Sequence, residues 1–167
     1  ADYGHNPDAM LALVQAIEGM PAVRRSVVIS GAGDRRDEDI RQQTEILGNA
    51  FDDAILYQDA CQRGRADGEV LRLLREGLEG APRTSKVEEI HGEFTAIDRA
   101  MDRLKPGDLC LILIDQVEEA LAHIQRRVQT ATPAPAPRKT AARKAARPRA
   151  PKRSKIAEAA GALALHL

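Results

Sequence analysis

The sequence predicts an α/β domain in which a mostly parallel sheet lies between two layers of helices. Short runs rich in apolar and β-branched residues alternate with longer segments in which apolar residues recur at helical spacing. Such alternation implies βαβ units, whose crossover helices cover both faces of the sheet. The predicted architecture is therefore three-layered and Rossmann-like. A basic tail that we expect to be disordered follows it.

Four short runs have the composition of β-strands. They lie at residues 26–30, 54–57, 86–90 and 109–114. The run at 109–114 is the strongest of the four, because it is apolar throughout, as a buried parallel strand requires. In contrast, residues 86–90 carry three charges, which is typical of an edge strand.

Helical segments precede and separate these strands. The first begins after Asn6, which is a good N-cap, places Pro7 at the first helical position, and ends near Gly19. The spacing of apolar residues predicts four more helices. These are expected at about residues 37–50, 70–80, 94–104 and 117–128.

The distribution of charge divides the chain at about residue 130. Residues 1–130 hold 16 of the 25 basic and 24 of the 25 acidic residues, a net charge of −8, whereas residues 131–167 hold nine basic residues and one acidic residue. Residues 131–155 consist almost entirely of Ala, Pro, Lys and Arg, so they lack the apolar surface needed to offset the entropy of ordering. We expect a folded domain at 1–130, a disordered tail at 131–155 and one short helix at 156–167.

Several classes of protein find no support in the sequence. The two cysteines, Cys61 and Cys110, have neither the spacing of a zinc site nor the number of a disulfide framework. No apolar stretch approaches the roughly 18 residues that a membrane span needs. The opening residues do not resemble a signal peptide, so the cytoplasm is the expected location.

Three polar loops lie where strands of the predicted sheet should end. They are residues 2–8, 31–37 and 57–65. Because the carboxyl ends of parallel strands share one edge, where ligands bind, we expect these loops to converge. Each loop alone is a weak signal, since a helix cap explains much of the first and a solvated turn explains the second. The glycines at 31 and 33 do not match the three-glycine dinucleotide fingerprint.

Taken in order, these loops resemble the C-terminal domain of the Mur ligase superfamily. The opening Asp-Tyr-Gly-His-Asn-Pro at residues 2–7 is similar to a signature of that superfamily. The segments that resemble the cyanophycin synthetase branch are residues 30–40, 55–57, 63–69, 106–108 and 115–117. The likeness covers about residues 1–128.

The resemblance implies a role in ATP-dependent amide bond formation. In this superfamily ATP activates a carboxylate as an acyl phosphate, which an incoming amine then attacks. The residues implied to bind the nucleotide are Asp2, His5, Asn6, Asp34 and Arg35. Arg63 and Arg65 are implied to hold the incoming amino acid, which is arginine in the cyanophycin synthetase branch.

The sequence departs from the superfamily in two respects. The strand that should lead into Asp2 is missing, and no Gly-x-x-x-x-Gly-Lys-Ser/Thr loop occurs. We therefore expect the phosphate-binding loop and the Mg²⁺ ligands to come from a central ligase domain in trans. No catalytic residue or metal ligand is assigned to this chain, which should be inactive alone.

Two rival interpretations remain open at this stage. The basic residues of 138–155 are able to bind nucleic acid or another polyanion through counterion release, without reading bases. In that case the protein is a non-enzymatic polyanion-binding protein, and the folded domain is only a carrier. Alternatively, the domain is a degenerate ligand-binding α/β domain.

Overall fold

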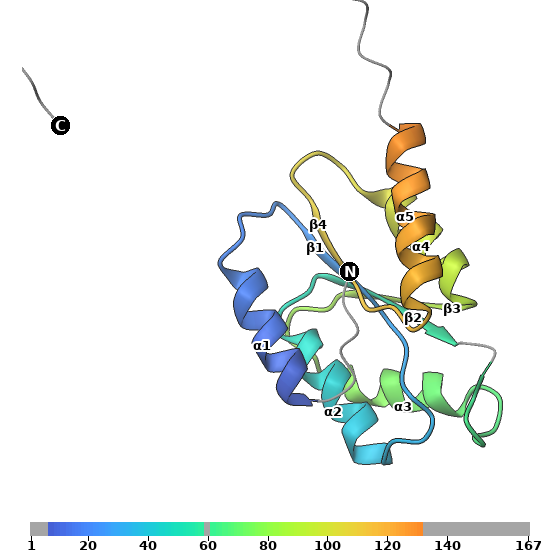
Figure 1. The fold of residues 1–167 in the computed structure, drawn as a ribbon. Helices are drawn as coiled ribbons and strands as arrows, with labels where there is room; N and C mark the ends of the chain where they lie inside the picture. The colour runs from blue at the N-terminus through green and yellow to red at the C-terminus, as the bar shows by residue number, and fades with distance from the viewer. Residues whose placement is uncertain (1–6, 59–60, 132–167) are drawn as a thin grey trace, which may run out of the picture. The chain divides into compact units, whose positions relative to one another are not determined.

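A computed structural model of the protein describes residues 7–58 and 61–131 (Figure 1). Helices and strands alternate along this part of the chain. In order, the elements are α1 (Pro7–Glu18), β1 (Arg25–Ile29), α2 (Asp37–Gly48), β2 (Asp53–Gln58), α3 (Glu69–Gly77), β3 (Lys86–His91), α4 (Glu93–Arg103), β4 (Leu109–Ile112) and α5 (Val117–Ala131). Every strand and helix predicted within these residues is present.

The four strands form one parallel sheet with the order β3-β2-β1-β4. In the centre of the sheet, Val28 of β1 is in register with Ile55 of β2 on one side and with Ile112 of β4 on the other. The charged strand β3 lies at an edge, as its composition predicts. The most apolar run forms β4, which is only four residues long and is the other outer strand of the described sheet.

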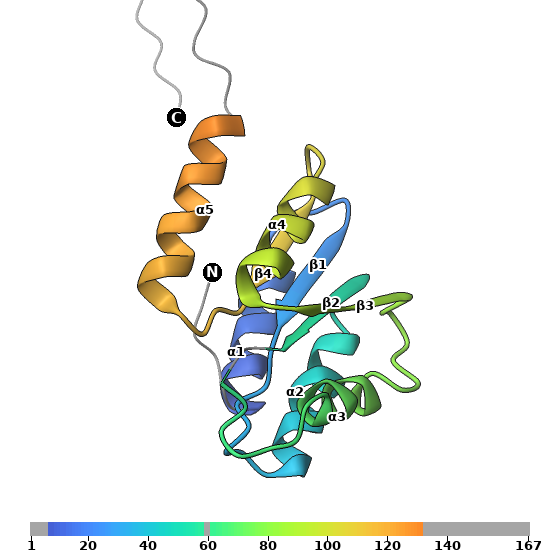
Figure 2. The same ribbon diagram turned by 90° about the vertical axis from the view of Figure 1, so that its right-hand side faces the viewer.

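Two hydrophobic cores lie on opposite faces of the sheet, and Figures 1 and 2 show helices covering both of these faces. Alternate residues of β1 point to opposite faces, so Val27 and Ile29 join one core and Val28 joins the other. The first core is covered by α1, α2 and α3, and the second by α4 and α5. The three-layer arrangement is therefore confirmed for the described residues.

Helix α5 continues to Ala131 instead of ending at 128, so its last turn enters the region predicted as tail. Residues 132–155 and 156–167, for which we predict disorder and a short helix, lie outside the described residues. None of the helices in residues 7–58 and 61–131 has the length and apolarity to span a bilayer.

Helices α2 and α3 pack closely because Gly77 lies at their contact. A Cβ atom at this position would lie 2.1 Å from the Arg41 carbonyl oxygen and 2.3 Å from the Thr44 hydroxyl. Only a residue without a side chain therefore permits the present separation of the two helices.

We predict that Gly77→Ala destabilises the domain by roughly 1–2 kcal/mol, because overpacking against backbone outweighs the gain of about 1 kcal/mol in helix propensity. Gly19→Ala is the matched control, since its Cβ would meet nothing closer than the Ala16 carbonyl oxygen at 3.8 Å. Urea denaturation compares the two variants. Equal midpoints would contradict the proposed close packing.

Candidate functional site

The loops that follow β1, β2 and β4 meet at the carboxyl edge of the sheet, and Arg63 lies between them. Its guanidinium contacts the Asp34 carboxylate after β1 at 3.3 Å and forms an ion pair of 3.5 Å with Asp115 after β4. The Arg63 backbone has a positive φ of 49°, which is uncommon for a residue with a side chain. One cation thus joins two carboxylates from separate strand ends.

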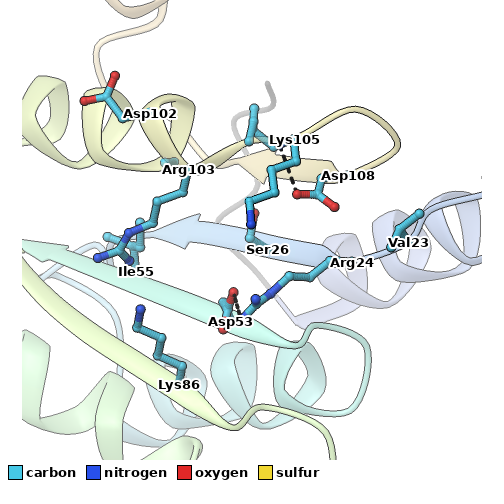
Figure 3. A pocket seen from close by; sticks show the side chains of 12 residues that line it. Val23, Arg24, Ser26, Asp53, Ile55, Lys86, Asp102, Arg103, Lys105 and Asp108 are labelled. Carbon is cyan, nitrogen blue, oxygen red and sulfur yellow. Dashed lines mark hydrogen bonds and ion pairs between the residues drawn. The ribbon is translucent and has the colours of Figure 1, made fainter.

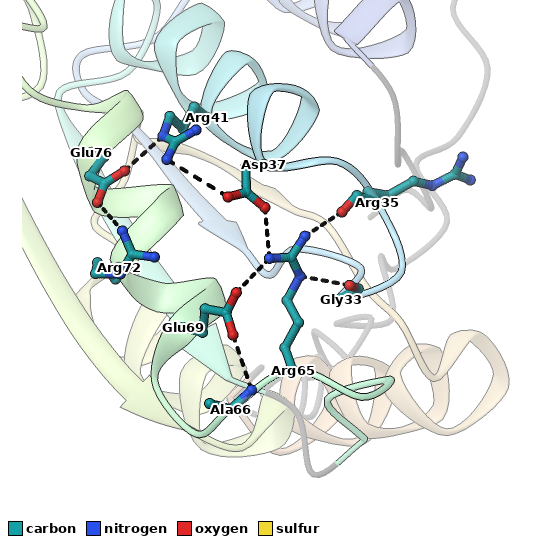
Figure 4. A network of polar contacts seen from close by, with 9 residues as sticks. All are labelled: Gly33, Arg35, Asp37, Arg41, Arg65, Ala66, Glu69, Arg72 and Glu76. Atoms are coloured by element: carbon teal, nitrogen blue, oxygen red, sulfur yellow. Dashed lines mark hydrogen bonds and ion pairs between the residues drawn. The ribbon is translucent and has the colours of Figure 1, made fainter.

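Arg65 connects the loop after β1 to the loop after β2, as Figure 4 shows. Its Nε donates to the Gly33 carbonyl at 2.7 Å, and its Nη2 donates to the Arg35 carbonyl. Its Nη1 lies 2.8 Å from Asp37 and 2.7 Å from Glu69. These four contacts leave the Arg65 guanidinium little donor capacity for a bound amino acid.

The contacts of Arg65 affect the titration of its two acidic partners. Hydrogen bonding to Arg65 is the largest of the effects that lower the pKa of the Asp37 carboxyl and the pKa of Glu69 below their ordinary values. A carboxylate with a lowered pKa in the folded state stabilises that state above the ordinary carboxyl range. This contribution is lost as the pH falls through the lowered pKa. The Arg65 contacts are therefore intact at neutral and mildly acidic pH.

The same two loops touch through their backbones at Gly33. A Cβ atom on Gly33 would lie 2.1 Å from the Gln62 carbonyl oxygen, so any side chain would force the loops apart. The end of β2 is also fixed by Gln58, whose buried side chain accepts a hydrogen bond of 2.8 Å from the Gly68 backbone and donates to Asp67. Both loops are thereby held in one arrangement.

Glu93, at the start of α4, holds the loop after β4. It is 2% exposed and accepts hydrogen bonds from the backbone N–H groups of Asp115 at 2.8 Å and Gln116 at 3.2 Å. This carboxylate therefore accepts amide donors just ahead of α5, where the helix dipole favours negative charge. Asp115 is positioned toward Arg63 by this anchor.

The predicted site residues that the structure describes lie in two adjoining loops, where Arg63 contacts the Asp34 side chain and Arg65 contacts the Arg35 backbone carbonyl. Figure 4 shows the Arg35 side chain directed away from the Arg65 contacts, and it is exposed. Asp2, His5 and Asn6 lie outside the described residues.

Sequence reasoning did not select Asp115 and Glu93 as site residues. Asp115 directly follows the strongest predicted strand. That position would place it at the carboxyl edge of the sheet, where ligands bind. No such signal exists for Glu93, which follows β3 as an ordinary charged residue at a helix start.

The remaining polar candidates lie elsewhere. On β4, Cys110 packs against the second core, and burial raises the pKa of its thiol. His123 of α5 contacts Asp98 of α4 at 2.7 Å and lies beside the ring of Phe94. Within the described residues, no three His, Cys, Asp or Glu side chains are arranged to hold a metal ion.

The fold places the chain in the class of parallel α/β domains, in which ligands commonly bind at the loops after the carboxyl ends of the strands. Residues 1–113 match the profile of the family described as Mur ligase, glutamate ligase domain. The chain belongs to this family.

Two relatives illustrate the similarity within the family. The chain is 34% identical over 126 residues to cyanophycin synthetase of Crocosphaera subtropica, a match that covers 75% of this chain and 14% of that protein. It is 34% identical over 112 residues to the UDP-N-acetylmuramoyl-L-alanyl-D-glutamate--2,6-diaminopimelate ligase of Zymomonas mobilis, with coverage of 66% and 21%. The chain thus spans a small part of the length of these relatives.

Solved structures share the fold. A UDP-N-acetylmuramoyl-L-alanyl-D-glutamate--2,6-diaminopimelate ligase has a TM-score of 0.62 at 20% identity, with 76% of this chain and 29% of that chain covered. FolC of E. coli in complex with ADP has a TM-score of 0.54 at 23% identity, with coverage of 77% and 28%. At these identities the likeness concerns the fold alone.

We predict that Arg65→Lys lowers the Tm by roughly 3–8 °C, because a lysine ammonium cannot reach four acceptors in separate directions. Amide hydrogen exchange at residues 31–36 should become faster than in the parent protein. Arg72→Lys is the control, since Arg72 is exposed and makes a simple pair with Glu76 on the same helix. If the two variants have the same Tm and the same exchange rates, Arg65 does not hold the loop after β1 in place.

Proposed function

We propose that this chain is the C-terminal lobe of an ATP-dependent amide ligase of the cyanophycin synthetase type, which contributes to nucleotide binding and positions the incoming amino acid. The observation that carries the proposal is the position of Arg63 between Asp34 and Asp115 at the carboxyl edge. Membership of the Mur ligase family and the identity to cyanophycin synthetases support it.

The contacts of Arg63 favour arginine as the amino acid. A guanidinium binds a carboxylate in bidentate fashion, so Arg63 suits the α-carboxylate of an amino acid. Asp34 and Asp115 already accept a guanidinium and suit the side chain of a bound arginine in the same way. Arginine carries both a carboxylate and a guanidinium. Its binding would replace the ion pairs of Arg63 with Asp34 and Asp115 by pairs of Arg63 with the substrate carboxylate and of the two aspartates with the substrate guanidinium. The net charge of −8 on residues 1–130 also favours a cationic substrate.

Within this proposal Arg65 acts through its neighbours. Arg65 fixes the backbone that carries Arg35. Because Arg65 also lies two residues after Arg63, it is a positioning residue for both arginines. The sequence predicts that Arg65 holds the amino acid directly, whereas we propose that it acts on the amino acid only through these neighbouring residues.

The nucleotide is assigned to the same edge. Arg35 is an exposed cation suited to a phosphate group, and we propose that it acts with Asp34, Asp2, His5 and Asn6. A central domain outside these 167 residues would supply the phosphate-binding loop and the Mg²⁺ ligands. The bound nucleotide supplies the phosphoryl group that activates the carboxylate. Such a reaction draws on cytoplasmic ATP.

Isothermal titration calorimetry of the full chain with L-arginine and with agmatine, which lacks the carboxylate, tests the role of Arg63. We expect arginine to bind about tenfold or more tightly than agmatine, and Arg63→Gln to remove this difference, since only arginine offers a carboxylate to Arg63. Asp115→Asn should weaken the binding of both compounds. Parallel titrations with ATP–Mg²⁺ test the nucleotide.

Arg126→Gln serves as the control, because Arg126 is an exposed cation in the later half of α5, 11 residues after Asp115. The proposal for arginine is wrong if arginine gives no binding heat with or without ATP–Mg²⁺. It is also wrong if Arg63→Gln and Arg126→Gln behave alike.

We propose a second activity for the basic segment at residues 138–155, which lies outside the described residues. Its support is the charge distribution, since the nine basic residues of 131–167 all lie in this segment. Such a segment binds polyanions by counterion release. A mobility shift of duplex DNA that weakens steeply with salt and disappears on truncation after Thr130 is the expected result. A shift that survives the truncation would place the binding elsewhere.

A further inference from the structure

A cavity lies at the end of the sheet opposite the Arg63 site, among the amino ends of the strands. Its volume is about 610 Å³, within the range of roughly 300–1,000 Å³ typical of small-molecule sites. Asp53 and Lys86 are the first residues of β2 and β3, and Arg103 is the last residue of α4. The cavity is therefore separate from the site around Arg63.

The floor of this cavity is apolar. Ile55 and Ala100, each 3% exposed, come from the sheet and from α4, and Val23 and Leu104 add apolar surface at the sides. Such a floor suits the hydrocarbon body of a small organic molecule.

The walls carry cations, and part of their charge is neutralised within the protein. Arg24 forms an ion pair of 2.6 Å with Asp53, and Arg103 pairs with Glu88 outside the cavity. The acidic lining residue Asp102 is likewise neutralised, by Arg127 of α5.

Two cations remain available. No side chain in the part of the chain that the structure describes forms a hydrogen bond or ion pair with the ammonium group of Lys86 or of Lys105. Figure 3 shows these two side chains extending from opposite walls into the same space. The one further acid of the lining, Asp108, accepts the Lys105 backbone N–H at 3.0 Å.

We propose that this cavity binds a small organic dianion, a dicarboxylate or a phosphate monoester, whose charged oxygen atoms contact Lys86 and Lys105 and whose carbon skeleton lies against Ile55 and Ala100. Two ammonium groups facing one apolar floor match two negative charges on a short apolar body. The inference does not rest on the proposed ligase function, because it involves none of the residues at the carboxyl edge.

Titration calorimetry of the full chain at low salt, with succinate and with ribose 5-phosphate, tests this site. At least one of the two should bind, and acetate, a monoanion, should bind about tenfold or more weakly. Succinate alone would identify the dicarboxylate class, and ribose 5-phosphate alone the phosphate class. Lys86→Gln and Lys105→Gln should each weaken binding about tenfold, whereas Arg126→Gln should leave it within about twofold.

Amide chemical shifts locate the binding independently of affinity. The bound dianion should shift the amides of Ser26, Ile55 and Ala100 and leave Gly33 and Arg65 unchanged. No binding of either probe, equal binding to the lysine variants and Arg126→Gln, or shifts confined to Gly33 and Arg65 would overturn the proposal. Circular dichroism of the variants checks folding, which substitution of the exposed Lys86 and Lys105 should not disturb.

Discussion

The arrangement of the candidate site depends on the contacts of Arg65. One guanidinium joins two backbone carbonyls of the loop after β1 to two carboxylates on α2 and α3. Loops at strand ends have few apolar side chains to fix them, so directional charged hydrogen bonds must do so. These contacts also place two neighbouring arginines. Arg63 lies two residues before Arg65, and Arg35 is held because its backbone carbonyl accepts a hydrogen bond from Arg65. A side chain that looks like a ligand-binding residue in the sequence is here part of the scaffold.

Much of the fold could be predicted because its determinants are local. The alternation of strand and helix patterns specifies a parallel sheet, and the charges of β3 identify an edge strand. The outer position of β4 was not predictable, because the apolar run 109–114 reports burial on both faces of the sheet and not the order of the strands. Parallel strands with covered faces have the same composition at the centre and near an edge.

The site could be predicted only in part, because its residues combine through contacts that are distant in sequence. The rule that ligands bind at the carboxyl edge led to the loops at 31–37 and 57–65, and the resemblance to the Mur ligase superfamily selected Asp34, Arg35 and Arg63 within them. The same rule would have selected Asp115, which follows a strand directly. Glu93 could not be found this way, since its burial depends on the position of α4 against the loop after β4, 22 residues away along the chain.

Helix α4 connects the two ends of the sheet. Its first residue, Glu93, holds the backbone of Asp115, and its last residue, Arg103, lines the cavity at the amino ends of the strands. The 11 residues of α4 form a helix about 16 Å long, and its hydrogen-bonded backbone keeps the distance between Glu93 and Arg103 nearly fixed. Because both ends belong to one helix, a displacement of α4 along its axis would move the anchor of the Asp115 backbone and the wall of the cavity together.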